Sequence, residues 1–356
     1  MRDRRQQRHT ARYQPGEKSA FARLRRFAGL WAALCLLVSL CACGSSDRGA
    51  DRTIRMELDN VPTIADPLLA SSTSELLVTY NIFEGLTRVS SDGEVTLAAA
   101  QSVSQDETNT VYTFTLREAE WSDGEPVRAQ DFVFGMRRAV DPSTKAKAAS
   151  SLFCIQNAEQ IVSGELPVSD LGVEAVDDRT LVIRLVQPMD SFLSLLSTNM
   201  TFPCREDVFI EAAGRYGMTQ KNIVCNGPFT LRRWTAKVSM TLSRNGHYDG
   251  SHPARSSAVI LQFDQSQEGR VERLDNQEID FGLLPDPSCV SSSTLSLYYD
   301  FNQSYALWFN LEHPILQEKS ARAALAGILD ESLLSASLPG EYRAASGLIP
   351  ASCTVG

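Results

Sequence analysis

The chain has 356 residues, of which 34 are Lys or Arg and 43 are Asp or Glu, so its formal net charge is −9. Hydrophobic residues make up 43% of the chain. The roughly 310 residues that follow the leader described below are enough for two domains or for one large domain with a substantial core. The acidic balance argues against nucleic acid as a partner, because contact with phosphates requires a basic surface.

Residues 1–42 have the order of charge and apolarity that is typical of a secretory signal peptide. Residues 1–26 are rich in Arg, and the apolar run that follows is too short to span a membrane. The junction Leu-Cys-Ala-Cys-Gly-Ser resembles a bacterial lipobox and makes Cys43 the predicted lipidated first residue, the alternative being an uncleaved signal anchor. Residues 43–52 then form a flexible tether. Without the leader, 25 basic residues stand against 41 acidic ones, a net charge of about −16.

The first part of the mature chain shows alternating patterns that predict strands around one helix. Residues 53–58 alternate as a strand, and residues 76–86 show helical spacing and end at Gly85. Residues 97–102 and 111–117 alternate again and predict a β-hairpin.

Residues 121–142 are the most informative stretch of the sequence. Asp123-Gly124 is a tight-turn dipeptide. Residues 129–140 carry apolar side chains on one helical face, with Asp131 in the first turn and two arginines in the last, as the helix dipole favours. Arg128 cannot cap this helix with a side-chain acceptor, a loss of roughly 1 kcal/mol. The stretch predicts a strand, a turn and a surface helix.

The remainder of the chain continues the alternation of helices and strands. It predicts a helix end at residues 159–164, a hairpin of residues 172–176 and 180–186, a short helix at 191–196, a helix from 271 that closes at Asn276 as a left-handed cap, strands at 281–284 and 304–311, and a helix at 319–334.

Several of these segments resemble motifs of the oligopeptide-binding family of extracellular solute-binding proteins, which supply ABC importers. The motifs are FEGL at 83–86, YTFTLR at 112–117, WSDGEP at 121–126, AQDFVFGMRRAVDP at 129–142, LGVEAVDDRTLVIRL at 171–185, NGPFTLRRW at 226–234 and LDNQEID at 274–280. The resemblance covers residues 53 to about 350. Members of the family continue well beyond the position of Gly356, so the resemblance implies a chain truncated at its C-terminus.

The resemblance implies an α/β fold of the periplasmic-binding-protein-like type, class II. A first lobe with a mixed sheet is expected at residues 53–305, with an inserted subdomain at about 87–170. Residues 306–356 are expected to begin a second lobe that is incomplete.

The same resemblance implies a function in transport and no enzymatic activity. It implies a monomeric receptor without a cofactor, lipid-anchored to the outer face of the cytoplasmic membrane or on its periplasmic side, that delivers peptides to a permease. Two alternatives remain: a truncated remnant that binds nothing, and a receptor for another solute such as a nickel chelate. An exported hydrolase is disfavoured because the sequence has no nucleophile constellation.

The resemblance also suggests which residues contact the ligand. Peptides are held in this family mainly through backbone contacts, and the loop after the Asp66-Pro67 turn is expected to line the cleft. The candidate residues are Ser71, Ser72, Thr73 and Ser74 in that loop, with Asn226, Tyr305 and Trp308 near the cleft wall or the crossover between lobes. The alternatives are an ordinary polar loop for the first four and structural roles for the other three.

The cysteines and histidines predict no metal site. Cys204 and Cys225 flank a helix-like loop and form the candidate disulfide, since exported proteins meet an oxidising environment. The sequence contains no Cys-x-x-Cys motif. His247 and His252 lie five residues apart in a polar loop, which is a poor spacing for metal ligands.

Overall fold

The computed structural model describes residues 52–58, 60–90, 92–263, 267–284, 290, 295–296 and 308–328. The predicted signal peptide, the lipidation site Cys43 and nearly all of the predicted tether lie outside these residues, as do Tyr305, Cys289 and Cys353. Among the helices of the described ranges, none is long and apolar enough to cross a membrane.

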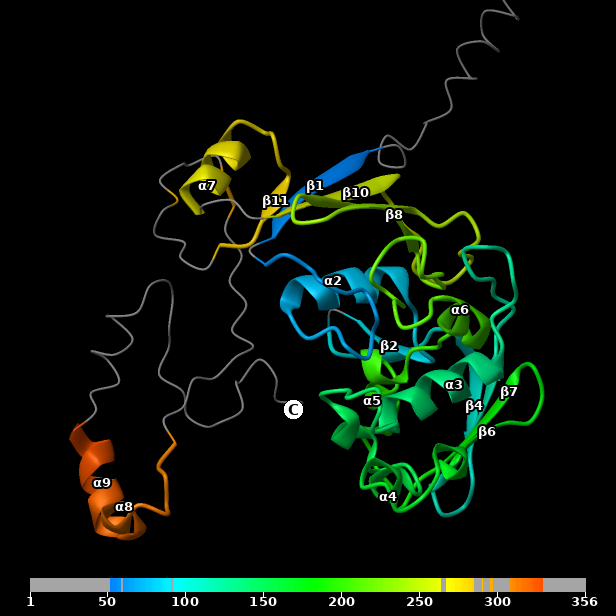
Figure 1. The fold of residues 1–356 in the computed structure, drawn as a ribbon, viewed down its shortest axis with the longest axis vertical. Helices are drawn as coiled ribbons and strands as arrows, with labels where there is room; N and C mark the ends of the chain where they lie inside the picture. Colours follow the sequence, from blue (N-terminus) through cyan, green and yellow to red (C-terminus); the bar gives the residue numbers. More distant parts are fainter. Residues whose placement is uncertain are drawn as a thin grey trace, which may run out of the picture. The chain divides into compact units, whose positions relative to one another are not determined.

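A mixed five-stranded sheet contains the first described strand and has the order β11-β1-β10-β9-β8 (Figure 1). Strand β1 pairs in parallel with β10 and β11, whereas β9 is antiparallel to both of its neighbours, β8 and β10. Strand β1 confirms the prediction for residues 53–58, and β10 was not predicted. The strands are β1 (Thr53–Leu58), β8 (Phe229–Thr235), β9 (Ser239–Arg244), β10 (Ala258–Phe263) and β11 (Phe281–Gly282).

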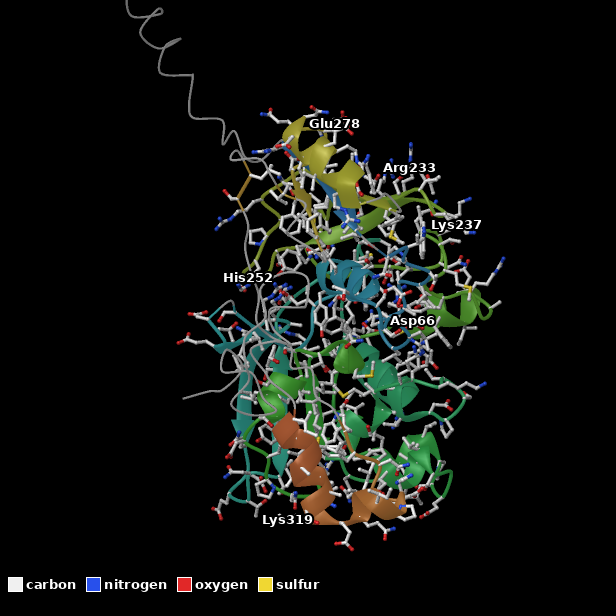
Figure 2. All side chains as sticks on the ribbon, turned by 90° about the vertical axis from the view of Figure 1, so that its left-hand side faces the viewer. Asp66, Arg233, Lys237, His252, Glu278 and Lys319 are labelled. Carbon is white, nitrogen blue, oxygen red and sulfur yellow. The ribbon has the colours of Figure 1, made fainter. Side chains whose placement is uncertain are left out.

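Strand β8 forms one edge of this sheet and carries exposed positive charge. Arg233 on β8 and Lys237 in the turn after it direct their side chains outward (Figure 2). The register of β8 against β9 shifts between Leu231 and Arg233, which is a bulge. Charged side chains and a bulge both discourage pairing of an edge strand with another chain. Protection of this edge therefore explains why Arg233 and Lys237 are exposed there.

Helix α2 (Thr73–Ile82) follows β1 and begins three residues earlier than predicted. Ser72 is its N-cap and forms a capping box with Glu75, which fixes the start of the helix. The helix ends at Ile82 instead of Gly85, because Phe83 is extended.

A second, antiparallel sheet has the strand order β4-β5-β7-β6 and confirms both predicted hairpins. The stretch predicted as one strand at 97–102 is divided between β3 and β4. The sheet continues beyond residue 170, where the inserted subdomain was expected to end. Its strands, and the separate pair β2-β3 that precedes it, are β2 (Thr87–Val89), β3 (Val95–Leu97), β4 (Ala100–Gln105), β5 (Val111–Leu116), β6 (Val173–Ala175) and β7 (Thr180–Arg184).

Helix α3 (Ala129–Val140) has the predicted bounds but is a buried helix and not a surface one. It packs against β6 and β7 on the small sheet. A Cβ atom on Gly135 would lie 2.3 Å from the carbonyl oxygen of Phe202, so only glycine permits this approach. At its start, one oxygen of the buried Asp131 accepts hydrogen bonds from the Arg128 amide (2.9 Å) and the Trp121 indole (3.0 Å). This carboxylate satisfies the amide of the N-cap residue, although Arg128 supplies no side-chain acceptor to the first turn.

The remaining helices are short. They are α4 (Ala158–Val162), α5 (Phe192–Leu195), α6 (Glu206–Glu211), α7 (Gln267–Asp275), α8 (Pro314–Gln317) and α9 (Lys319–Ile328). After α7 the left-handed residue is Gln277, with φ 59°, and not Asn276 as predicted. Residues 308–310 are not in a strand, and the rest of the strand predicted at 304–311 lies outside the described residues.

Candidate functional site

A buried ion pair between Asp66 and Arg138 stabilises the segment from Asp66 to the start of α2. Asp66 is 2% exposed. One oxygen of its carboxylate accepts from the Leu68 amide (3.1 Å), and its carbonyl accepts from the amides of Leu69 and Ala70. The other carboxylate oxygen accepts from the Arg138 guanidinium at the end of α3 (2.6 Å). A charge removed from water is stable only when it is paired, so this pair fixes the turn.

A second carboxylate, Glu75, fixes the end of the same segment. One oxygen accepts from the amide (3.1 Å) and hydroxyl (2.7 Å) of Thr63, and the other from the amides of Ser71 (3.1 Å) and Ser72 (3.2 Å). Burial alone would raise the pKa of Glu75, but these hydrogen bonds outweigh it and lower the pKa to about 2. The backbone of residues 63–72 is therefore arranged around one ionised side chain.

The four residues predicted to line the cleft have different environments. Ser71 and Thr73 are exposed, Ser72 is the N-cap of α2, and Thr73 and Ser74 are its first two residues. Ser74 is fully buried, and its hydroxyl has no hydrogen-bond partner among the residues that the structure describes. The predicted loop is thus a helix start with two exposed residues, Ser71 and Thr73.

Lys147 lies beside this helix start, a contact that was not predicted. Its ammonium donates to the Ser71 hydroxyl (3.0 Å) from the loop that follows α3. The two residues are 76 positions apart, so no local pattern could have paired them.

Asn226 was also predicted to lie near the cleft wall. Its side chain instead forms hydrogen bonds with the backbone of Glu84. Its side chain is buried, accepts from the Glu84 amide (3.0 Å) and donates to the Glu84 carbonyl (2.9 Å). The neighbouring Gly227 amide donates to the Ile82 carbonyl (3.0 Å), and a Cβ there would lie 2.7 Å from the Ile82 carbonyl carbon. These contacts favour the structural alternative for Asn226.

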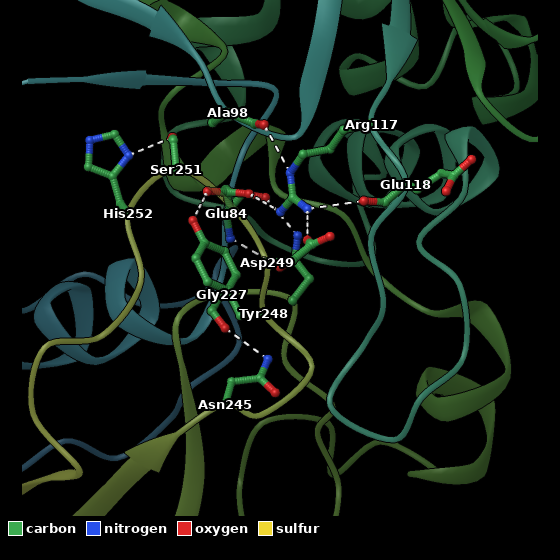
Figure 3. Close-up of polar contacts among 11 residues, drawn as sticks. Glu84, Ala98, Arg117, Glu118, Gly227, Asn245, Tyr248, Asp249, Ser251 and His252 are labelled. Atoms are coloured by element: carbon green, nitrogen blue, oxygen red, sulfur yellow. Dashed lines mark hydrogen bonds and ion pairs between the residues drawn. The ribbon is translucent and has the colours of Figure 1, made fainter. Parts of the chain in front are cut away.

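A charged cluster around the buried Glu84 joins the FEGL and YTFTLR motifs to the loop after β9 (Figure 3). The Glu84 carboxylate accepts from the Arg117 guanidinium (2.8 Å) and the Tyr248 hydroxyl (2.5 Å). Arg117 also bonds Asp249 and lies 5.5 Å from the centre of the Tyr248 ring. Burial and the Glu84 charge raise the pKa of Tyr248, so it is a neutral donor. The cluster links the end of α2, the end of β5 and the loop after β9, and its role is structural.

A polar pocket of about 520 Å³ lies next to this cluster. The polar side chains of its walls pair with one another: Arg179 with Glu118 (3.3 Å), His247 with Glu120 (2.7 Å) and Arg128 with Asp178 (3.7 Å). His252 instead contacts Ser251. In the part of the chain that the structure describes, no group of three or more His, Cys, Asp or Glu residues could hold a metal ion.

The predicted disulfide between Cys204 and Cys225 is wrong, because both residues are free thiols in the structure. The Cys204 sulfur accepts from Arg138 (3.3 Å), whereas the Cys225 amide donates to the Ser122 hydroxyl (3.0 Å). Burial raises the pKa of Cys204 to about 11 and that of Cys225 to about 12. Cys154 is also free.

The role of Trp308 stays a prediction. Its side chain is 79% exposed, and it precedes α8 and α9, which pack against each other. Tyr305 lies outside the described residues.

Comparisons with known proteins agree on one family. A family model described as bacterial extracellular solute-binding proteins, family 5 middle, matches residues 94–354. The chain is 32% identical to the probable deoxycholate-binding periplasmic protein YgiS of Escherichia coli, over 81% of this chain and 55% of that protein. It is 27% identical to the oligopeptide-binding protein OppA of Bacillus subtilis, over 86% of this chain and 58% of that protein.

A solved structure shows the same likeness. The structure of Listeria monocytogenes OppA bound to peptide is 31% identical, with a TM-score of 0.62, over 64% of this chain and 46% of that one. The chain therefore spans about half the length of the relatives it matches.

Proposed function

The chain belongs to family 5 of the bacterial extracellular solute-binding proteins, and we propose on that premise that it is the peptide receptor of an ABC importer. The family assignment and the similarity to OppA confirm the predicted α/β fold of the periplasmic-binding-protein-like type. A ligand would bind between two lobes and shift an open–closed equilibrium toward the form that the permease recognises. No chemical reaction and no cofactor belong to this proposal.

The observation that carries the proposal is the exposed, rigid helix start at Ser71 and Thr73. Two carboxylates, Asp66 and Glu75, fix its backbone from inside. Peptides bind to such backbone through main-chain hydrogen bonds, which do not depend on the side chains of the peptide. Because the backbone is already ordered, little conformational entropy is lost when the peptide binds.

The lipid anchor is the second part of the proposal. The basic segment, the apolar run and the lipobox-like junction support acylation of Cys43 in a monomer held at the outer face of the cytoplasmic membrane or on its periplasmic side. Labelled fatty acid should enter the wild-type chain and not the Cys43→Ser variant. Equal labelling of both would refute the anchor and leave the peptide proposal standing.

The Thr73 amide permits a sharp test of binding through the backbone. Thr73 is the first residue of α2, where proline fits because its missing N–H has no intrahelical acceptor. Ser72 before it is already extended, with φ −82° and ψ 154°, as a residue before proline requires. Thr73→Pro therefore removes one exposed donor with little change to the helix. Thr73→Ala keeps the donor and is the matched control.

The measurement is calorimetric titration of the purified chain with a pool of short peptides. We expect micromolar heat with the wild type and Thr73→Ala, and weaker binding with Thr73→Pro. Equal binding by all three would refute backbone recognition at this site. If no peptide produces a heat of binding, the result favours one of the two alternative functions: a remnant that binds nothing, or a receptor for another solute. A titration with deoxycholate and a nickel chelate separates those rivals, deoxycholate being included because of the relative that is described as binding it.

A further inference from the structure

The exposed helix start at Ser71 and Thr73, called the Ser71–Thr73 wall below, lies next to the positively charged Lys147. Lys147 is exposed and donates to the Ser71 hydroxyl (3.0 Å). It forms no ion pair with any carboxylate of the described residues. An ammonium group has three donors, and one of them is used here, so two remain for a ligand.

The Glu75 carboxylate, which accepts from the Ser71 amide, does not take this role. Both oxygens of Glu75 are held by the amides and hydroxyl of Thr63, Ser71 and Ser72. The buried Glu75 carboxylate is therefore already fully hydrogen-bonded within the protein. Lys147 keeps its charge on the exposed side.

Lys147 also sits on an ordered loop. The Asp141 carboxylate accepts from the Ser143 amide (2.8 Å), and the Asp141 carbonyl accepts from the Thr144 amide (3.0 Å). Lys145 adopts a left-handed backbone with φ 57°, and a 3₁₀ turn begins at Ala149. The ammonium is thus brought to Ser71 by fixed backbone on both sides, which reduces the ordering cost of a contact.

The loop is basic in a chain that is acidic as a whole. Residues 142–149 carry Lys145 and Lys147 and no acidic residue, while the chain has a net charge of −9. A local positive site of this kind attracts an anionic group of a ligand and repels a cationic one.

We propose that Lys147 binds a carboxylate of the ligand, so that the receptor prefers peptides with an acidic group next to the Ser71–Thr73 wall. The inference rests on the proposed function, because it places the ligand at that wall. The carboxylate is either an acidic side chain or the C-terminus of the peptide. A charge-assisted hydrogen bond that is partly exposed gives a preference of about 3- to 10-fold over the matching amide.

The test compares four peptides of one sequence by calorimetry: Glu or Gln at an internal position, each with a free or an amidated C-terminus. The wild-type chain should bind the acidic member of one of these pairs about 3- to 10-fold more tightly. The pair that shows the difference identifies the source of the carboxylate. Lys147→Gln should abolish the difference and bind the amides as the wild type does. Lys147→Arg should keep it, and so should Lys145→Gln, which removes the neighbouring charge.

The outcomes separate the inference from the proposed function. If the wild type binds these peptides without any acid preference, or if Lys147→Gln leaves the preference intact, the inference is overturned and the receptor proposal stands. If the wild type binds none of the peptides, the proposed function fails and the inference falls with it. A purely structural bond between Lys147 and Ser71 would change stability but leave the ratio of acid to amide affinity at its wild-type value.

Discussion

The ion pair between Asp66 and Arg138 should couple the segment that precedes α2 to α3. The two charged atoms are 2.6 Å apart, and their side chains are 2% and 8% exposed. Arg138 also lies 4.0 Å from the centre of the Phe209 ring. Removing one partner of such a pair leaves a buried, uncompensated charge, which costs about 3–5 kcal/mol. Arg138→Met removes the cation and keeps most of the apolar volume, so we expect a loss of that size.

The double variant separates the lost charge from the lost packing. Asp66→Asn also leaves one charge unpaired, so it should be destabilising by a similar amount. Asp66→Asn with Arg138→Met leaves neither charge, and it should be less destabilised than the sum of the two single variants by at least about 2 kcal/mol. The assay is the free energy of unfolding from urea titrations followed by circular dichroism. Additive effects, or a cost below about 1 kcal/mol for Arg138→Met, would refute the coupling.

Three further predictions concern buried polar groups. Glu75 has a folded pKa of about 2 against an ordinary value of 4.5, so its stabilisation is complete above about pH 4.5 and is lost as the pH falls toward 2; the difference in urea midpoint between wild type and Glu75→Gln should shrink over that range, and a constant difference would contradict it. Asn226→Ala leaves the Glu84 amide and carbonyl unpaired and should cost about 1–3 kcal/mol in urea unfolding, with unchanged peptide affinity per folded molecule. Cys204 and Cys225 should resist alkylation at pH 8 in the native chain and react in urea without reductant, as judged by mass spectrometry; no reaction in urea would mean a disulfide.

The elements that the sequence predicted well are those with local causes. The bounds of α3 follow from its apolar spacing and from Asp131 in its first turn, which are all within 12 residues. Its burial could not be predicted in the same way, because it depends on the approach of Gly135 to Phe202, 67 positions away. The local sequence pattern therefore predicts where a helix begins and ends. The residues that pack against the helix depend on the rest of the chain.

The start of α2 is a miss that the sequence could have avoided. Ser72 and Glu75 have the spacing of a capping box, and that signal lies inside the loop that was predicted to line the cleft. β10 is different: residues 258–263 are an apolar run that becomes a strand between β1 and β9, and its place in the sheet depends on both of these neighbours. Lys147 had no local signal at all, since its contact with Ser71 exists only in the folded chain.

The residues in the family motifs make structural contacts within the fold. These motifs therefore identify the family but give little information about the ligand. Glu84 and Arg117 come from two of these motifs, and the buried Glu84 carboxylate accepts hydrogen bonds from Arg117 and from Tyr248 in the loop after β9. Changing such a residue to suit a new ligand would leave a buried partner unpaired, at a cost in stability. Exposed residues between the motifs, such as Thr73 and Lys147, carry no such penalty. Ligand preference can therefore diverge among relatives whose motifs and fold agree, and the residues that set it must be sought outside the motifs.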